Sequence, residues 1–139
     1  MKKAFTLLEL VVVIIILGVL ATLGFTQYGR MVERARGAEA RAILGDIRKF
    51  AAAYKLENGT ITGMLPASVN IGTAADQIPS ACTGTHYFSY GVVAGATLAT
   101  TATRCTAAGK TPQGILAGTL ILTSDLTTGV DTWSGSGGY

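Results

Sequence analysis

Apolar residues fill almost every position from Phe5 to Phe25, directly after a short leader that contains Lys2 and Lys3. As a helix, this run of about 21 residues is about 31 Å long, which matches the hydrocarbon thickness of a bilayer. A cleaved secretory signal fits poorly, because the apolar core is long and no A-x-A site follows it. The pattern therefore predicts a membrane-spanning helix. Basic residues lie on both sides of it, so charge alone leaves its orientation open.

Helical spacing continues beyond this run. From position 28 to position 54, apolar residues recur mostly at intervals of three or four, which predicts an amphipathic continuation of the same helix. Lys55 supplies a basic last turn, and Asn58 and Gly59 supply a left-handed stop. The expected helix covers residues 5–57 and is about 80 Å long. A domain of this size cannot cover it, so its N-terminal half must project and be buried by lipid or by other copies.

Charges of both signs are mixed along the amphipathic half. Seven basic and four acidic residues lie between positions 30 and 57. This mixture is typical of a solvated helix face with local ion pairs and not of a nucleic-acid interface. Glu33 and Arg36 are assigned to this solvated side.

The second half of the chain has the sequence pattern of a β-sheet. Proline, glycine, serine and asparagine recur through residues 58–85, which predicts an irregular connector. Four strand-like stretches follow, at residues 86–90, 97–104, 115–123 and 130–133. They predict an antiparallel sheet of three or four strands whose apolar face is covered by the amphipathic helix, an α+β fold. Phe88 and Trp133 are expected in the core.

Candidate chemistry is sparse. Cys82 and Cys105 are the only cysteines, and outside the cytoplasm they are expected to form a disulfide that stabilises the fold by about 3 kcal/mol. Their spacing does not fit C-x-x-C redox or zinc chemistry, and the single His86 cannot complete a metal set. We find no nucleophile with a supporting base and no phosphate-binding loop, so the sequence indicates neither an enzyme nor a cofactor.

Glu9 is the one ionisable residue inside the apolar run. Desolvating a charge there is costly, so such a residue indicates function and needs a partner. No residue between Phe5 and Phe25 is positively charged. A free α-amino group would serve, if the chain were cut just before Phe5.

The stretch Lys3-Ala4-Phe5-Thr6-Leu7-Leu8-Glu9-Leu10, followed by an apolar helix with Gly18, resembles the class III signal peptide of type IV pilins and type II secretion pseudopilins. The resemblance implies the pilin fold and cleavage between Ala4 and Phe5 by a prepilin peptidase, with methylation of the new Phe5 amine. Family members usually have glycine in place of Ala4. The N-terminus would lie inside and the domain outside, and Glu9 would meet the Phe5 amine of a neighbouring subunit.

The sequence also indicates where the helix could loosen and into which parts the chain divides. Gly18 and Gly24 are candidates for close packing or local loosening of the helix. Thr26 stands where many pilins carry a proline that loosens the helix. The expected parts are a leader (1–4), a transmembrane or filament-core helix half (5–27), an amphipathic half (28–57), a connector (58–85) and a sheet domain with a C-terminal loop (86–139).

Three functions stay open. The first is a structural subunit of a type IV pilus-like filament, the second a pseudopilin of a type II secretion system, and the third a single-span anchored extracytoplasmic binding domain. Major pseudopilins commonly hold calcium in a C-terminal loop, where Asp125 and Asp131 are weak candidates because calcium takes about six to eight oxygen ligands. The cysteine pair favours a pilin.

The resemblance also implies partners and a location. The partners are other copies, the prepilin peptidase, an inner-membrane assembly platform with its ATPase, and membrane lipid before assembly, with no direct nucleic-acid partner. The chain would span the inner membrane with a cytoplasmic N-terminus and a periplasmic domain. After assembly it would form part of an extracellular filament.

Overall fold

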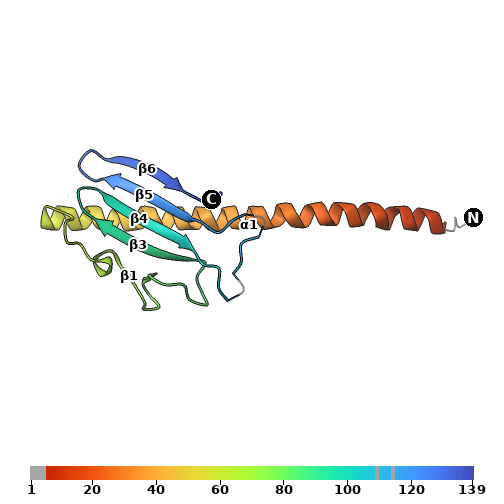
Figure 1. Ribbon diagram of the computed structural model, residues 1–139, viewed down its shortest axis with the longest axis horizontal. Helices are drawn as coiled ribbons and strands as arrows, with labels where there is room; N and C mark the ends of the chain where they lie inside the picture. Colours follow the sequence, from red (N-terminus) through yellow and green to blue (C-terminus); the bar gives the residue numbers. More distant parts are fainter. Residues whose placement is uncertain (1–5, 109, 114) are drawn as a thin grey trace, which may run out of the picture.

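One long helix carries a small sheet domain on its C-terminal half in the computed structural model, which describes residues 6–108, 110–113 and 115–139 (Figure 1). The predicted α+β arrangement is confirmed. The elements of the described chain are α1 (Leu7–Asn58), a 3-10 helix η1 (Pro66–Val69), and the strands β1 (Ile71–Gly72), β2 (Ile78–Pro79), β3 (Phe88–Ala94), β4 (Leu98–Arg104), β5 (Thr119–Asp125) and β6 (Val130–Gly135).

Local sequence caps both ends of α1. Thr6 is the N-cap, and its side chain accepts a hydrogen bond from the Glu9 amide at 3.2 Å while the Glu9 carboxylate accepts one from the Thr6 amide at 3.0 Å. This reciprocal pair is a capping box. At the other end Gly59 adopts a left-handed conformation with φ 74°, and its amide donates to the Lys55 carbonyl. The predicted stop is confirmed, whereas Phe5, the predicted start, lies outside the described residues.

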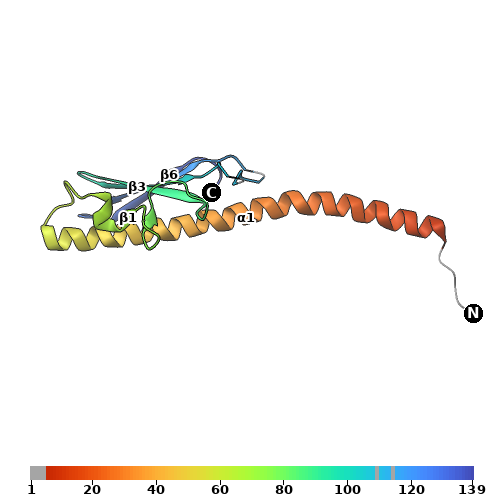
Figure 2. The ribbon, with the colours of Figure 1, turned by 90° about the horizontal axis from the view of Figure 1, so that it is seen from below.

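α1 is bare over its N-terminal half and covered over its C-terminal half (Figures 1 and 2). The buried positions recur every three or four residues and all lie beyond position 32: Glu33, Gly37, Ala40, Leu44, Ile47 and Ala51. This spacing places them on one stripe that faces the sheet. The amphipathic half of the helix is therefore the cover of the sheet.

The sheet has the strand order β3-β4-β5-β6, and each neighbouring pair is antiparallel. Its register fixes which side chains face α1, because alternate residues of a strand point to opposite faces. Tyr90, Ala102 and Leu120 are aligned across three strands and are buried against the helix. The core consists of this sheet face, the buried stripe of α1, and residues of the connector.

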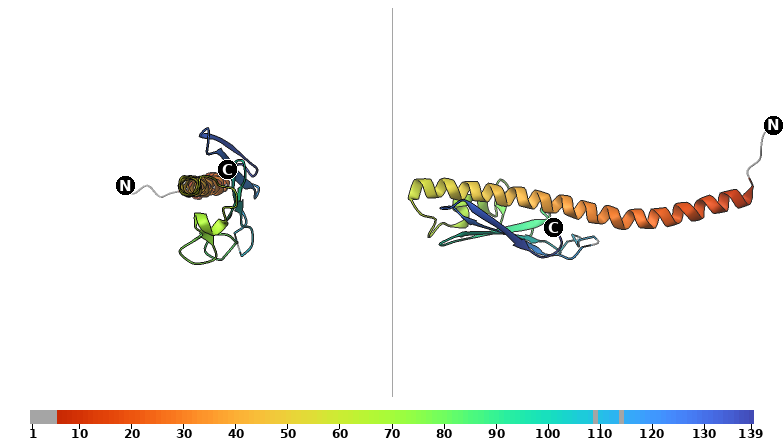
Figure 3. Two further views of the ribbon diagram at one scale, coloured as in Figure 1. Left: turned by 90° about the vertical axis from the view of Figure 1, so that its left-hand side faces the viewer. Right: turned by 90° about the horizontal axis from the view of Figure 1, so that it is seen from above.

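Two expectations about the sheet are wrong. The stretch 115–123 does not begin as a strand: β5 starts at Thr119, so Ile115 and Leu116 lie in the loop that precedes it. Trp133 is not a core residue, since it is 46 % exposed, whereas Phe88 is buried as predicted. Trp133 belongs to β6, an edge strand whose residues are all exposed, and the single helix does not extend over this edge (Figure 3).

The connector is more regular than predicted. η1 is followed by β1 and β2, which pair in parallel with Ile71 opposite Ile78. Its buried apolar side chains join the main core: Ile61, Met64, Val69 and Ile71. The connector therefore extends the core along α1, and the boundaries that we assigned to the parts of the chain stay a prediction.

Glycines on α1 differ in what they contact, and this difference generates a test. A Cβ added to Gly37 would lie 2.9 Å from the Cβ of Tyr139, whereas one added to Gly45 would meet no atom within 4 Å. We expect Gly37→Ala to lower the free energy of unfolding by about 1 kcal/mol or more, because the core is overpacked there. Gly45→Ala should raise it by up to about 1 kcal/mol through helix propensity. Denaturant titration of the detergent-solubilised chain measures the free energy of unfolding of both variants. If Gly37→Ala and Gly45→Ala were equally stabilised, the close contact between Gly37 and Tyr139 would not matter for stability.

Candidate functional site

The carboxylate of Glu9 lies at the start of α1 and takes part in the local cap. Its Oε2 atom accepts hydrogen bonds from the amide and the hydroxyl of Thr6, at 3.0 and 2.8 Å. In the part of the chain that the structure describes, the hydrogen bonds to this carboxylate all end on Oε2. Ala4 and Phe5, the predicted cleavage and methylation positions, lie outside the described residues, so the pairing of Glu9 with a Phe5 amine stays a prediction.

The helix that follows Glu9 offers a long apolar surface. Its large side chains from Leu7 to Met31 are exposed in the single chain. The most apolar window has a mean hydropathy of 2.8 with none of it buried, so the helix is long and apolar enough to cross a membrane. Such a surface is stable only where lipid or protein covers it.

The helix is continuous through the positions assigned to packing or loosening. A Cβ added to Gly18 or to Gly24 would meet no atom within 4 Å. Thr26 donates its hydroxyl hydrogen bond to the Leu23 carbonyl at 2.9 Å. Back-bonding of this kind goes with gentle helix bending, and α1 is visibly curved (Figure 2). Roles of these residues in packing or loosening within an assembly stay predictions.

A buried ion pair joins the sheet to α1 where the covered half begins. Arg104 donates from Nε to Glu33 Oε2 at 3.0 Å and from Nη2 to Glu33 Oε1 at 2.9 Å. Both side chains are completely buried, and Arg36 also donates to Oε1. Our assignment of Glu33 to the solvated side is therefore wrong. Arg104 gave a usable signal, since it shares the alternation of the inward-facing residues Leu98 and Ala102.

Electrostatics keep the Glu33 carboxylate ionised. Burial alone would raise the pKa of Glu33, but the hydrogen bonds and charge of Arg104, with a smaller contribution from Arg36, hold that pKa below its usual value. Arg104 is also satisfied on its remaining side, because Nη1 donates to the carbonyls of Tyr87 and Cys105. A buried ion pair with its hydrogen-bonding groups satisfied in this way holds its two elements in one arrangement.

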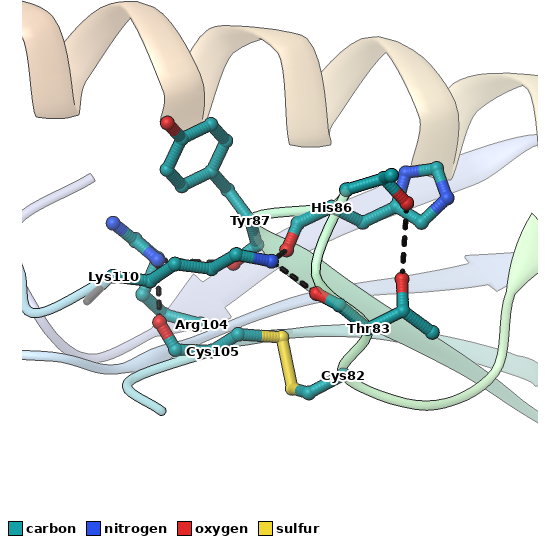
Figure 4. The surroundings of a disulfide bond; sticks show 8 residues. Cys82, Thr83, His86, Tyr87, Arg104, Cys105 and Lys110 are labelled. Atoms are coloured by element: carbon teal, nitrogen blue, oxygen red, sulfur yellow. Dashed lines mark hydrogen bonds between the residues drawn. A yellow bond between two sulfur atoms is a disulfide. The ribbon is translucent and has the colours of Figure 1, made fainter. Parts of the chain in front are cut away.

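The disulfide lies next to Arg104, which Cys105 follows in the chain (Figure 4). Cys82 and Cys105 are bonded, as predicted, and tie the connector to the end of β4. Lys110 reaches from the following loop and donates to the carbonyls of Thr83 and His86. His86 thus contributes its backbone to the region. The disulfide, Lys110 and Arg104 together fix the end of the sheet nearest the bare helix half.

The two weak calcium candidates do not converge. Ser124 pairs with Asp131 and Asp125 with Val130, so the two aspartates sit on opposite faces of the sheet. Asp131 forms an ion pair with Arg48 on α1. Hydrogen bonds from the Thr127 backbone, then from Thr128, hold the pKa of Asp125 below its usual value and order the β5–β6 turn. Each carboxylate therefore has a structural partner.

A known sequence motif covers the start of the chain and part of the bare half of α1. Residues 1–25 match the prokaryotic N-terminal methylation motif. The chain carries the class III signal peptide of type IV pilins and pseudopilins. This pilin motif includes Ala4, Phe5, Glu9 and Gly18, and it belongs to a structural family and not to an enzyme family. The pilin motif implies processing by a prepilin peptidase and assembly into filaments, and the apolar helix suits a single-pass inner-membrane anchor. No solved structure matches the chain.

The buried ion pair can be tested by removing one partner. Arg104→Met leaves Glu33 buried without its main counter-charge, and we expect the free energy of unfolding to fall by about 3–5 kcal/mol. Lys49→Met is the control, because it breaks the exposed Lys49–Asp46 pair and should change that free energy by less than about 1 kcal/mol. Denaturant titration compares the variants, and similar small losses would contradict the assigned role.

The pH dependence of this difference gives a second readout. The pKa of Glu33 is lowered on folding, so the charged pair contributes stability above the ordinary glutamate pKa of about 4.3 and loses it as pH falls towards the lower folded value. The stability gap between wild type and Arg104→Met should therefore shrink in acid. A gap that is constant between neutral and acid pH would contradict the ion-pair explanation.

Proposed function

We propose that the chain is a structural subunit of a type IV pilus-like filament, assembled from the inner membrane by packing of N-terminal helices. The observation that carries the proposal is the bare apolar half of α1, which starts within the methylation motif. Lipid would cover this surface before assembly, and the helices of other copies would cover it afterwards. The sheet domain is packed only on the far half of α1, so the exchange would not require it to unfold.

Glu9 provides the selectivity of this exchange. Cleavage between Ala4 and Phe5 would create an α-amine, and N-methylation would keep its positive charge. Oε2 of Glu9 accepts hydrogen bonds from Thr6, and Oε1 would accept a hydrogen bond from the Phe5 amine of a neighbouring subunit. In an apolar interior an unpaired charge is costly, so a wrongly placed or missing neighbour is disfavoured.

Several observations favour a pilus subunit over a secretion pseudopilin and over a single-span binding domain. A pseudopilin of a type II secretion system would share the whole N-terminal half, but the divergence of Asp125 and Asp131 gives no support to a calcium loop of the kind common in major pseudopilins. The disulfide also favours a pilin. A single-span binding domain would require neither Glu9 nor a cleavable leader.

Glu9→Gln tests the proposal without removing the cap. Glutamine at this position still supports a capping box, so only the charge is lost. In cells that assemble the filament, we expect surface filaments to fall by about tenfold or more, because each buried amine would lack its partner. The amount of chain in the membrane fraction should not change, and immunoblots of sheared filaments and of membranes measure both.

Glu57→Gln is the matched control, since this carboxylate is exposed at the opposite end of α1 and should leave the filament yield unchanged. Mass spectrometry of the mature chain should find a methylated Phe5 at its start. Normal filament yield from Glu9→Gln would rule out the proposed role, and an uncut Met1 would favour a simple membrane anchor.

A further inference from the structure

We propose that, before assembly, the described part of the loop between β4 and β5 (residues 105–108, 110–113 and 115–118) rests on the outer surface of the membrane, with Leu116 in the lipid interface and Arg34 at anionic headgroups. This inference rests on the proposed function, because it requires the N-terminal half of α1 to span the bilayer. It assigns a lipid-binding surface to the sheet domain itself.

The position of the loop is the first support. The described residues of this loop are the part of the sheet domain that reaches farthest towards the bare helix half (Figure 3). It contacts α1 at Gly29, where an added Cβ would lie 2.8 Å from the Cβ of Gln113. Gly29 is four residues, or about 6 Å, beyond the end of the apolar run at Phe25. That distance corresponds to the headgroup layer, which is about 5–7 Å thick on each side of the hydrocarbon core.

The chemistry of the loop is the second support. Leu116 is 82 % exposed, and the loop sequence contains no acidic residue. Its one charged residue, Lys110, is turned inward to the carbonyls of Thr83 and His86. The outer surface of the described loop is thus uncharged and carries an apolar side chain. An exposed leucine alone is unremarkable, but here it lies beside the expected bilayer surface.

Side chains of α1 at the same level fit an interface. Tyr28 is 68 % exposed, and tyrosine is enriched where membrane and water meet. Arg34 is exposed about 9 Å farther along α1, within reach of headgroup phosphates because long arginine side chains extend back towards the interface. A basic side chain close to the level of the uncharged loop complements an anionic lipid surface.

Docking of this kind would fix how the domain stands on the membrane. The loop continues directly from β4 and is held to the connector by the disulfide and by the hydrogen bonds of Lys110, so contact at Leu116 would orient the whole sheet domain. A single leucine and one arginine make a weak, reversible contact, which a subunit can leave when it enters a filament.

Tryptophan quenching tests this placement in the full chain. The background is Trp133→Phe, and single tryptophans are introduced as Leu116→Trp, Phe25→Trp and Leu56→Trp, all at exposed positions. The variants are reconstituted into vesicles of phosphatidylcholine and phosphatidylglycerol whose acyl chains are brominated near the headgroups. We expect brominated lipid to quench the fluorescence of Leu116→Trp and Phe25→Trp, because both tryptophans would lie at the membrane interface. Leu56→Trp, at the far end of α1 and 88 % exposed in the parent chain, should lose little.

The outcomes separate this inference from the proposed function. If Phe25→Trp is quenched and Leu116→Trp behaves like Leu56→Trp, the docking is wrong and the membrane span stands. If Phe25→Trp is also unquenched, the span fails and the docking fails with it. A Leu116→Trp signal that responds to protein concentration in detergent, and not to brominated lipid, would assign the loop to a neighbouring copy and overturn the lipid contact.

The dependence of quenching on anionic lipid tests the headgroup contact that we assign to Arg34. Quenching of Leu116→Trp should weaken in vesicles without phosphatidylglycerol, and Arg34→Gln should remove this dependence on anionic lipid. Lys49→Gln is the control, since Lys49 is an exposed cation near the other end of α1 and should leave the dependence intact. Equal quenching of Leu116→Trp with and without anionic lipid would overturn the assignment of Arg34.

Discussion

The buried pair of Glu33 and Arg104 determines where the sheet domain begins on α1. Glu33 is the first buried residue of the helix, and Arg104 is the last residue of the central strand β4. Glycines lie four residues to either side of Glu33 on the same helix face, and each is in close contact with a loop: Gly29 with Gln113, and Gly37 with Tyr139. The absence of side chains at these positions lets the loops approach α1 closely enough to keep water from the ion pair. Since both charges need each other, the sheet cannot slide along the helix.

Local patterns in the sequence predicted the helix far better than they predicted this pair. The stop at Gly59 depends on neighbouring residues alone, and the continuation of the helix beyond the apolar run follows from helical spacing. The burial of Glu33 instead depends on a residue 71 positions away, so the helix sequence by itself assigned it to the wrong side. The burial of Trp133 was mispredicted for a similar reason, because strand alternation gives a face but does not say whether the helix extends over that edge.

The two faces of the sheet explain why its strands are rich in threonine. Many threonines of the central strands point away from α1: Thr101, Thr103, Thr119 and Thr123. Threonine is branched at Cβ and fits a strand, while its hydroxyl suits solvent, so this face is stable without charge. The charged residues of the domain serve instead as contacts between elements, as in Arg48 with Asp131 and Lys55 with Thr127. The domain is therefore joined to its half of α1 at several points along the helix.

Two glutamates of α1, Glu33 and Glu9, differ in where a counter-charge is available to them. Glu33 has its counter-charge inside the chain, so its burial is complete when the domain folds. Glu9 has a local hydrogen-bonding partner in Thr6, which is neutral, and in the described chain it lies on the bare apolar surface. A hydroxyl orients a carboxylate but does not neutralise it, so transfer of Glu9 into an apolar environment still requires a cation. The methylation motif supplies the means of creating one at a chain terminus. The same physical constraint that fixes the domain on α1 would thus, at Glu9, be satisfied only between subunits.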